Sequence, residues 1–88
     1  MQTEPEALHR EIVKEIARTL GFSEKNIPTQ INEGQAATVL GVIPTTLGNW
    51  RCTGRYNLAY IKTGRLVRYR VADLAAWIAK RRTGAAEG

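Results

Sequence analysis

The cationic side chains of this chain are concentrated in one segment. Residues 51–82 hold nine basic side chains against one acidic residue, whereas residues 1–50 hold four basic and six acidic ones. An excess of eight positive charges over about thirty residues is typical of a surface that binds a polyanion, because each phosphate it neutralises releases condensed counterions. A charged surface that only keeps the protein soluble is the alternative. The nine basic residues are Arg51, Arg55, Lys62, Arg65, Arg68, Arg70, Lys80, Arg81 and Arg82.

The sequence contains no cluster of residues that indicates catalysis or metal binding as clearly as the basic residues indicate a polyanion. One cysteine, Cys52, and one histidine, His9, are too few for a zinc site, which usually has four protein ligands. The sequence pairs no serine or cysteine with a histidine, clusters no carboxylates and has no glycine-rich phosphate loop. We therefore expect a protein that is not an enzyme and that uses no metal and no cofactor.

Length and hydropathy point to one small domain. The chain has 88 residues, of which 43% are hydrophobic, and its apolar runs stay far below the roughly 20 residues of a membrane span. The N-terminus also lacks the layout of a signal peptide. We expect a soluble cytoplasmic protein with no membrane partner.

Two short helices separated by a tight turn are predicted ahead of the cationic segment. Asn32 and Gln35 have the spacing of a capping box at the start of a helix that runs to Leu40. Gly41 provides a left-handed residue that ends this helix, and Pro44 suits the first turn of the next one. The pattern is a helix, a turn of a few residues and another helix.

The second of these helices, which Gly54 ends, has a small polar outer face. Leu47 and Trp50 lie three residues apart and are predicted to face inward. The residues that then face outward are Thr45, Gly48, Asn49 and Cys52.

A β-hairpin is predicted in the stretch "LAYIKTGRLVRYRV". Residues with high β propensity lie on both sides of Gly64, which tolerates the positive φ of a tight turn. Alternation then places Val67 and Tyr69 on one face, while Arg68 and Arg70 face the solvent.

A helix is predicted on each side of this central region. Residues 5–20 form an amphipathic helix whose apolar stripe recurs every fourth residue, and the polar segment 23–30 reads as a linker. The stripe either packs onto the rest of the domain or contacts a neighbouring subunit. Residues 72–82 form a closing helix with Leu74, Trp77 and Ile78 at core spacing, followed by a disordered tail at 83–88. The stripe consists of Leu8, Ile12, Ile16 and Leu20.

Four blocks of sequence resemble one known family. "AATVLGV", "TTLGNWRCTGR", "YIKTGRLVRYR" and "ADLAAWIAKR", in this order and spacing, resemble the winged helix-turn-helix of phage excisionases and AlpA-type regulators, which is related to the DNA-binding head of the MerR family. The resemblance covers residues 31–82 and leaves 1–30, the N-terminal helix and linker, outside. It implies a fold that is mainly α with a small β-hairpin. One departure is Ile43, which stands where the family commonly has a serine or threonine cap.

In the family, the helix after the turn enters the major groove and the hairpin wing lies against the minor groove or the backbone. The threonines and the asparagine of this helix would reach base edges or nearby phosphates, and Asn49 is the preferred base reader because an amide can bind adenine through two hydrogen bonds. Arg51 and Arg55 would clamp the backbone, and three hairpin cations would complete the contacts. Exposed residues without any DNA role are the alternative. The implied contacts are Thr45, Thr46, Asn49, Arg51, Arg55, Lys62, Arg65 and Arg68.

The resemblance implies a recombination directionality factor, or excisionase, as the leading function. Such a protein binds double-stranded DNA, associates head to tail with further copies of itself, bends an attachment site and favours excision by a separate site-specific integrase. It would act at the bacterial nucleoid on a prophage or another mobile element. An AlpA-like transcriptional regulator is one alternative, and a protein-interaction adaptor whose charge serves only solubility is another.

Overall fold

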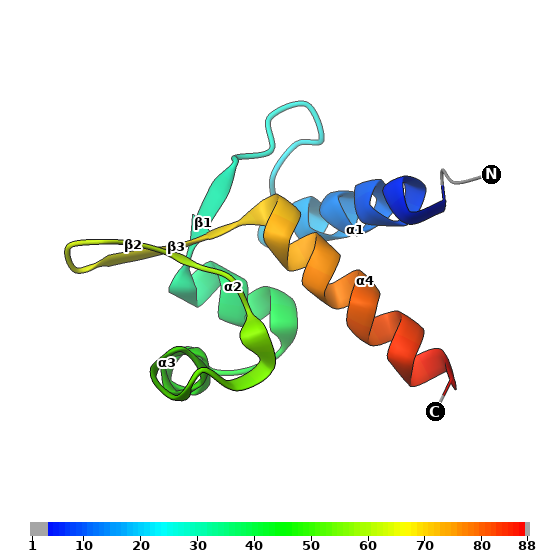
Figure 1. The fold of residues 1–88 in the computed structure, drawn as a ribbon. Coiled ribbons are helices and arrows are strands. Elements are labelled where there is room, and N and C mark those ends of the chain that lie inside the picture. Colours follow the sequence, from blue (N-terminus) through cyan, green and yellow to red (C-terminus); the bar gives the residue numbers. More distant parts are fainter. Residues whose placement is uncertain (1–3, 88) are drawn as a thin grey trace.

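The computed structural model describes the backbone of residues 4–87 and the side chains of residues 7–81. The described chain contains four α-helices and a three-stranded antiparallel sheet, which is the predicted winged helix-turn-helix behind an N-terminal helix (Figure 1). A short 3₁₀ turn at Arg55–Asn57 joins the third helix to the hairpin. The elements in chain order are α1 (Glu4–Leu20), β1 (Gln30–Asn32), α2 (Glu33–Leu40), α3 (Pro44–Thr53), β2 (Ile61–Thr63), β3 (Leu66–Arg70) and α4 (Val71–Glu87).

The start of α2 and the turn that follows it have the predicted hydrogen bonds. Asn32 Oδ1 accepts from the Gln35 backbone N–H at 2.7 Å, and Gln35 Oε1 accepts from the Asn32 N–H at 2.9 Å, which confirms the capping box. Gly41 ends α2 with a φ of 74°, and its N–H donates to the last turn of the helix. Pro44 begins α3, as predicted.

Ile43 occupies the N-cap position of α3 and gives the helix no side-chain hydrogen bond. Its backbone carbonyl accepts from the Thr46 N–H at 2.9 Å, while its apolar side chain is 64% exposed. The missing serine or threonine cap therefore leaves the start of α3 open to an acceptor from outside the chain.

The strand β1 was not predicted. It pairs with β3 in an antiparallel ladder that sets Ile31 opposite Tyr69, so the sheet has the order β1-β3-β2. The sequence pattern predicts a linker over the whole of residues 23–30, but Gln30 already belongs to the strand. The strand has only three residues, of which one is buried, so it carries too little alternation to be recognised locally.

The apolar stripe of α1 is part of the single core. Ile12 and Ile16 are 1% and 2% exposed and belong to the same buried cluster as Leu74 and Ala75 of α4. Of the two roles considered for the stripe, packing onto the domain is confirmed, and a contact with a neighbouring subunit is excluded for these two isoleucines. The N-terminal helix is thus a structural part of the domain.

Two features of α4 differ from the prediction. The helix was predicted to end near Arg82 and to be followed by a tail, but its backbone continues through residues 83–87 and ends at Glu87. Trp77 is half-buried and lies outside the main core, in contrast to Leu74 and Ile78 at the neighbouring core positions. Its indole Nε1 donates to the Tyr56 carbonyl at 2.8 Å, so the side chain holds the 3₁₀ turn that follows α3.

Candidate nucleic-acid interface

The outer face of α3 is small, polar and exposed. Leu47 is buried and Trp50 packs against the core, which confirms the predicted inner face. Thr45 and Asn49 are exposed, whereas Thr46 is half-buried. Because the exposed side chains are short, another molecule can approach the helix backbone closely here.

The β2–β3 hairpin extends from the same side of the molecule as α3. In Figure 1 both elements lie on the left, while α1 and the C-terminal end of α4 lie on the right. The hairpin turns at Gly64, whose φ of 61° lies in the left-handed region. The helix and the hairpin together are therefore one candidate interface.

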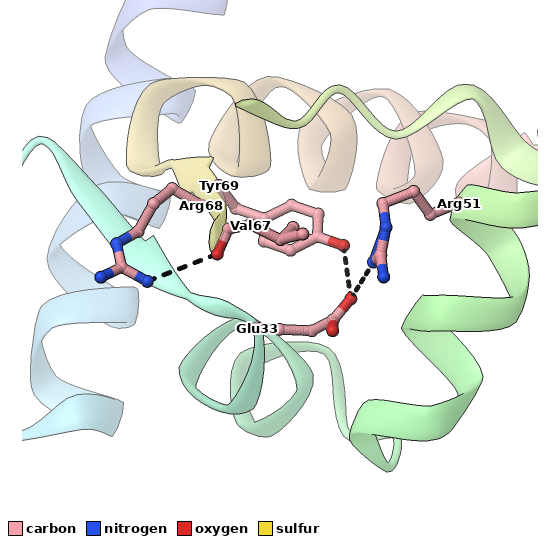
Figure 2. Close-up of polar contacts among 5 residues, drawn as sticks. All are labelled: Glu33, Arg51, Val67, Arg68 and Tyr69. Carbon is pink, nitrogen blue, oxygen red and sulfur yellow. Dashed lines mark hydrogen bonds and ion pairs between the residues drawn. The ribbon is translucent and has the colours of Figure 1, made fainter. Parts of the chain in front are cut away.

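Lys62 and Arg65 are cations of the hairpin that are free to bind a ligand. Both are exposed, and neither forms an ion pair with any of the side chains described between residues 7 and 81. Arg68 is half-buried, and its Nη1 donates a long hydrogen bond of 3.4 Å to the Val67 carbonyl. In Figure 2 the Arg68 guanidinium and the Tyr69 hydroxyl point in opposite directions from β3.

Arg55 lies beyond α3 on the 3₁₀ turn. Its side chain is exposed, with Cζ 6.0 Å from the centroid of the Tyr56 ring. Tyr56 has a positive φ of 64° and packs edge-on against Trp50, with ring centroids 4.7 Å apart. This packing and the hydrogen bond from Trp77 hold the backbone of the 3₁₀ turn in place beside α3. The position from which the Arg55 side chain extends is therefore fixed.

Arg51 is set apart from the other predicted contacts. Its guanidinium Nη1 forms an ion pair with the Glu33 carboxylate, and only 21% of its side chain is exposed. Its Cζ also lies 5.8 Å from the centroid of the Tyr60 ring. Arg51, which was predicted to bind the DNA backbone, thus already has an acidic partner inside the protein.

Glu33 is a central residue of this region that was not predicted from the sequence. Its Oε2 accepts from the Tyr69 hydroxyl at 3.1 Å and from Arg51, so one carboxylate oxygen joins α2, α3 and β3 (Figure 2). Burial, assisted by the hydrogen bond to Glu33, raises the pKa of Tyr69 to about 12, and the hydroxyl stays protonated as a donor. Glu33 is separated by 18 and 36 residues from its two partners, so no local pattern could indicate the contact.

The described residues contain no candidate metal site and no helix that could span a membrane. No group of three or more His, Cys, Asp or Glu residues lies close together in this part of the chain. None of its helices combines the length and the apolar character needed to cross a bilayer. Cys52 is a free, exposed cysteine on α3.

A comparison with family models matches most of the chain after α1. A model described as a helix-turn-helix domain matches the 49 residues from 34 to 82, more than half of the 88-residue chain. The matched segment runs from α2 through α3 and the hairpin into α4, and it contains all the candidate contacts on α3 and the hairpin. No curated protein matches the chain.

Proposed function

This chain belongs to the helix-turn-helix domain family, a DNA-binding family that includes AlpA/excisionase-like proteins, and we propose that it is an excisionase. It binds an attachment site on double-stranded DNA, bends it, and favours excision of a mobile element by a separate integrase. The protein itself supplies binding and geometry, and the integrase supplies the strand chemistry.

The observation that carries the proposal is that α3, with its exposed and short polar residues, and the cationic β2–β3 hairpin lie on the same side of the fold (Figure 1). In this proposal α3 lies in the major groove, where Thr45, Thr46 and Asn49 reach base edges or nearby phosphates. A phosphate oxygen accepts from the uncapped start of α3, where Ile43 offers no side-chain acceptor. The phosphate contacts beyond α3 are Arg55, Lys62, Arg65 and Arg68.

The small size of the interface favours several copies on one site. One helix and one hairpin cover only a few base pairs, so a single copy binds weakly. Copies that bind adjacent repeats head to tail would add affinity through their contacts with one another, and such an arrangement continues along the duplex without closing into a dimer. Copies placed in phase along the helix also bend the DNA between them.

An excision assay in cells separates the proposal from its nearest alternative, an AlpA-like regulator. Expression of the protein together with the element's integrase is expected to increase the yield of excised circles, measured by amplification across the rejoined site. Integrase alone is the control. Activation of a promoter without any rise in excised circles would favour the regulator and contradict the excisionase.

Asn49→Ala is expected to reduce sequence preference while the protein still binds DNA. Loss of a bidentate contact to adenine narrows the free-energy gap between site and non-site duplexes by about 1–3 kcal/mol. The target duplex is obtained by footprinting the protein on DNA beside its own gene, and both affinities are measured by fluorescence anisotropy.

Cys52→Ala is a matched control for Asn49→Ala, because it shortens another exposed side chain of α3. Cys52→Ala should leave the preference for the target duplex over non-site duplexes unchanged. An Asn49→Ala protein that retains the full preference would show that another residue reads the base.

The salt dependence of duplex affinity tests the adaptor alternative. A protein-interaction adaptor is expected to bind duplex DNA negligibly at physiological salt. A DNA-binding protein is expected to bind, with an affinity that falls steeply as the logarithm of the salt concentration rises.

A further inference from the structure

The carboxylate of Glu33 connects α2 with α3 and β3, the two elements that carry the candidate interface. Glu33 is the first residue of α2, Arg51 lies in the last turn of α3, and Tyr69 belongs to β3 of the hairpin. Oε2 of Glu33 accepts from both partners, as the dashed lines in Figure 2 show. We call Glu33, Arg51 and Tyr69 the Glu33 network.

The Glu33 network is more shielded from water than an ordinary surface ion pair. The side chains of Arg51 and Glu33 are 21% and 25% exposed, whereas those of the other described pair, Arg18 and Glu24, are 61% and 50% exposed. Screening by solvent and salt is weaker at a partly buried pair, so removal of one partner leaves the other charge poorly compensated. The network is therefore expected to restrict the motion of α3 relative to β3.

Two tyrosine rings lie beside the network on the hairpin side. The Tyr60 ring, which precedes β2, lies 5.8 Å from the Arg51 Cζ, and its centroid is 6.5 Å from that of Tyr69. Tyr69 is 1% exposed. Arg51 is thus held by Glu33 and the Tyr60 ring, and a phosphate could bind it only in competition with the Glu33 carboxylate.

We propose that Glu33 and Arg51 are positioning residues: the Glu33 network fixes α3 relative to the hairpin so that both fit one duplex, and Arg51 binds no phosphate. This inference rests on the proposed DNA binding. It replaces the backbone-clamp role that the family resemblance implied for Arg51. The remaining cations, Arg55 and those of the hairpin, then account for the phosphate contacts.

The sign of the effect of Glu33→Gln tests this inference. A carboxylate near a polyanion is repelled, so if Glu33 had no other role its neutralisation would leave duplex affinity unchanged or increase it. If Glu33 positions α3, neutralisation weakens its hold on Arg51 and Tyr69, and affinity for the target duplex falls about tenfold. Affinity is measured by anisotropy over a series of salt concentrations, and circular dichroism verifies that each variant is folded.

Arg51→Met gives a second, independent measurement. A residue that binds a phosphate contributes about 0.9 to the slope of log affinity against log salt, and its loss lowers the slope by that amount. A positioning residue leaves the slope unchanged. We expect Arg51→Met to lose about the same affinity as Glu33→Gln, and the double variant to lose little more than either, because both act through one network.

Two further variants complete the experiment. Glu24→Gln removes the same charge from the exposed pair with Arg18 and should leave affinity almost unchanged. Tyr69→Phe removes only the hydroxyl donor to Glu33, and it replaces Arg51→Met if that protein does not fold. A several-fold loss of affinity with an unchanged salt slope supports the inference for this variant also.

The outcomes distinguish this inference from the proposed function. An unaltered protein that binds no duplex even at low salt would refute DNA binding and the positioning role with it. If the unaltered protein binds, then a Glu33→Gln variant of equal or higher affinity, or an Arg51→Met variant with a slope lower by about 0.9, overturns the positioning role alone.

Discussion

Alanine at both Ile12 and Ile16 is expected to unfold the entire chain, including the family domain at residues 34–82. These isoleucines of α1 are 1% and 2% exposed within the core shared with α4. Each truncation removes about 2–5 kcal/mol from the free energy of unfolding, and a domain of this size has only about 4–13 kcal/mol in total. Urea titration followed by circular dichroism measures the loss.

Exposed positions on the same helix provide the control. Lys14→Ala and Glu15→Ala, made together, change α1 without changing the core and should alter the free energy of unfolding by less than about 1 kcal/mol. If the Ile12 and Ile16 double variant unfolded cooperatively with almost the original stability, α1 would not be an essential part of the core. The stripe would then be available to a partner after all.

The elements that local chemistry determines could be predicted from the sequence. The capping box of Asn32 with Gln35, the left-handed Gly41 and Gly54 and the proline at the start of α3 each act within a few residues. Such signals are present in the sequence whatever the rest of the chain does. These signals predict the bounds of α2 and α3, whereas α1 and α4 follow from apolar periodicity and the fold class from the family resemblance.

The features that were missed depend on distant parts of the chain. The strand β1 is defined by its pairing with β3, in which Ile31 lies opposite the buried Tyr69. Trp77 has the spacing of a core residue, but its polar Nε1 bonds to the turn after α3, which keeps the ring near the surface. Periodicity describes one element at a time and cannot reveal which element packs beside it.

Some features of the candidate site could also be predicted from the sequence, and others could not. The outward face of α3 and the solvent face of β3 follow from helical and strand periodicity, and the exposed Asn49 and the buried Tyr69 agree with them. The environment of Arg51 does not follow, because Glu33 lies 18 residues away on another helix. A cluster of arginines in a sequence therefore shows where cations are numerous and leaves open which of them are free.

Charge reversal of Lys62 and Arg65 to glutamate is expected to weaken binding to every duplex, site and non-site alike, by about 100-fold or more. Both side chains are exposed on the hairpin and unpaired within the described residues 7–81, so both are free to bind phosphates. Loss of two charge-assisted contacts at about 1.5 kcal/mol each corresponds to this factor, and the salt slope should fall by about two. Anisotropy titrations at several salt concentrations measure both quantities.

The control must carry the same total charge, since net charge alone also attracts DNA. Arg10→Glu and Lys14→Glu together make the same change on exposed residues of α1, on the side of the molecule away from α3 and the hairpin (Figure 1). Because charges farther apart than about 10 Å are largely screened at 0.1 M salt, this control should lose much less affinity and keep its slope. Equal losses in the two variants would mean that the hairpin attracts DNA only through the charge of the whole protein. A loss confined to Lys62 and Arg65 would instead place the phosphate backbone against the hairpin.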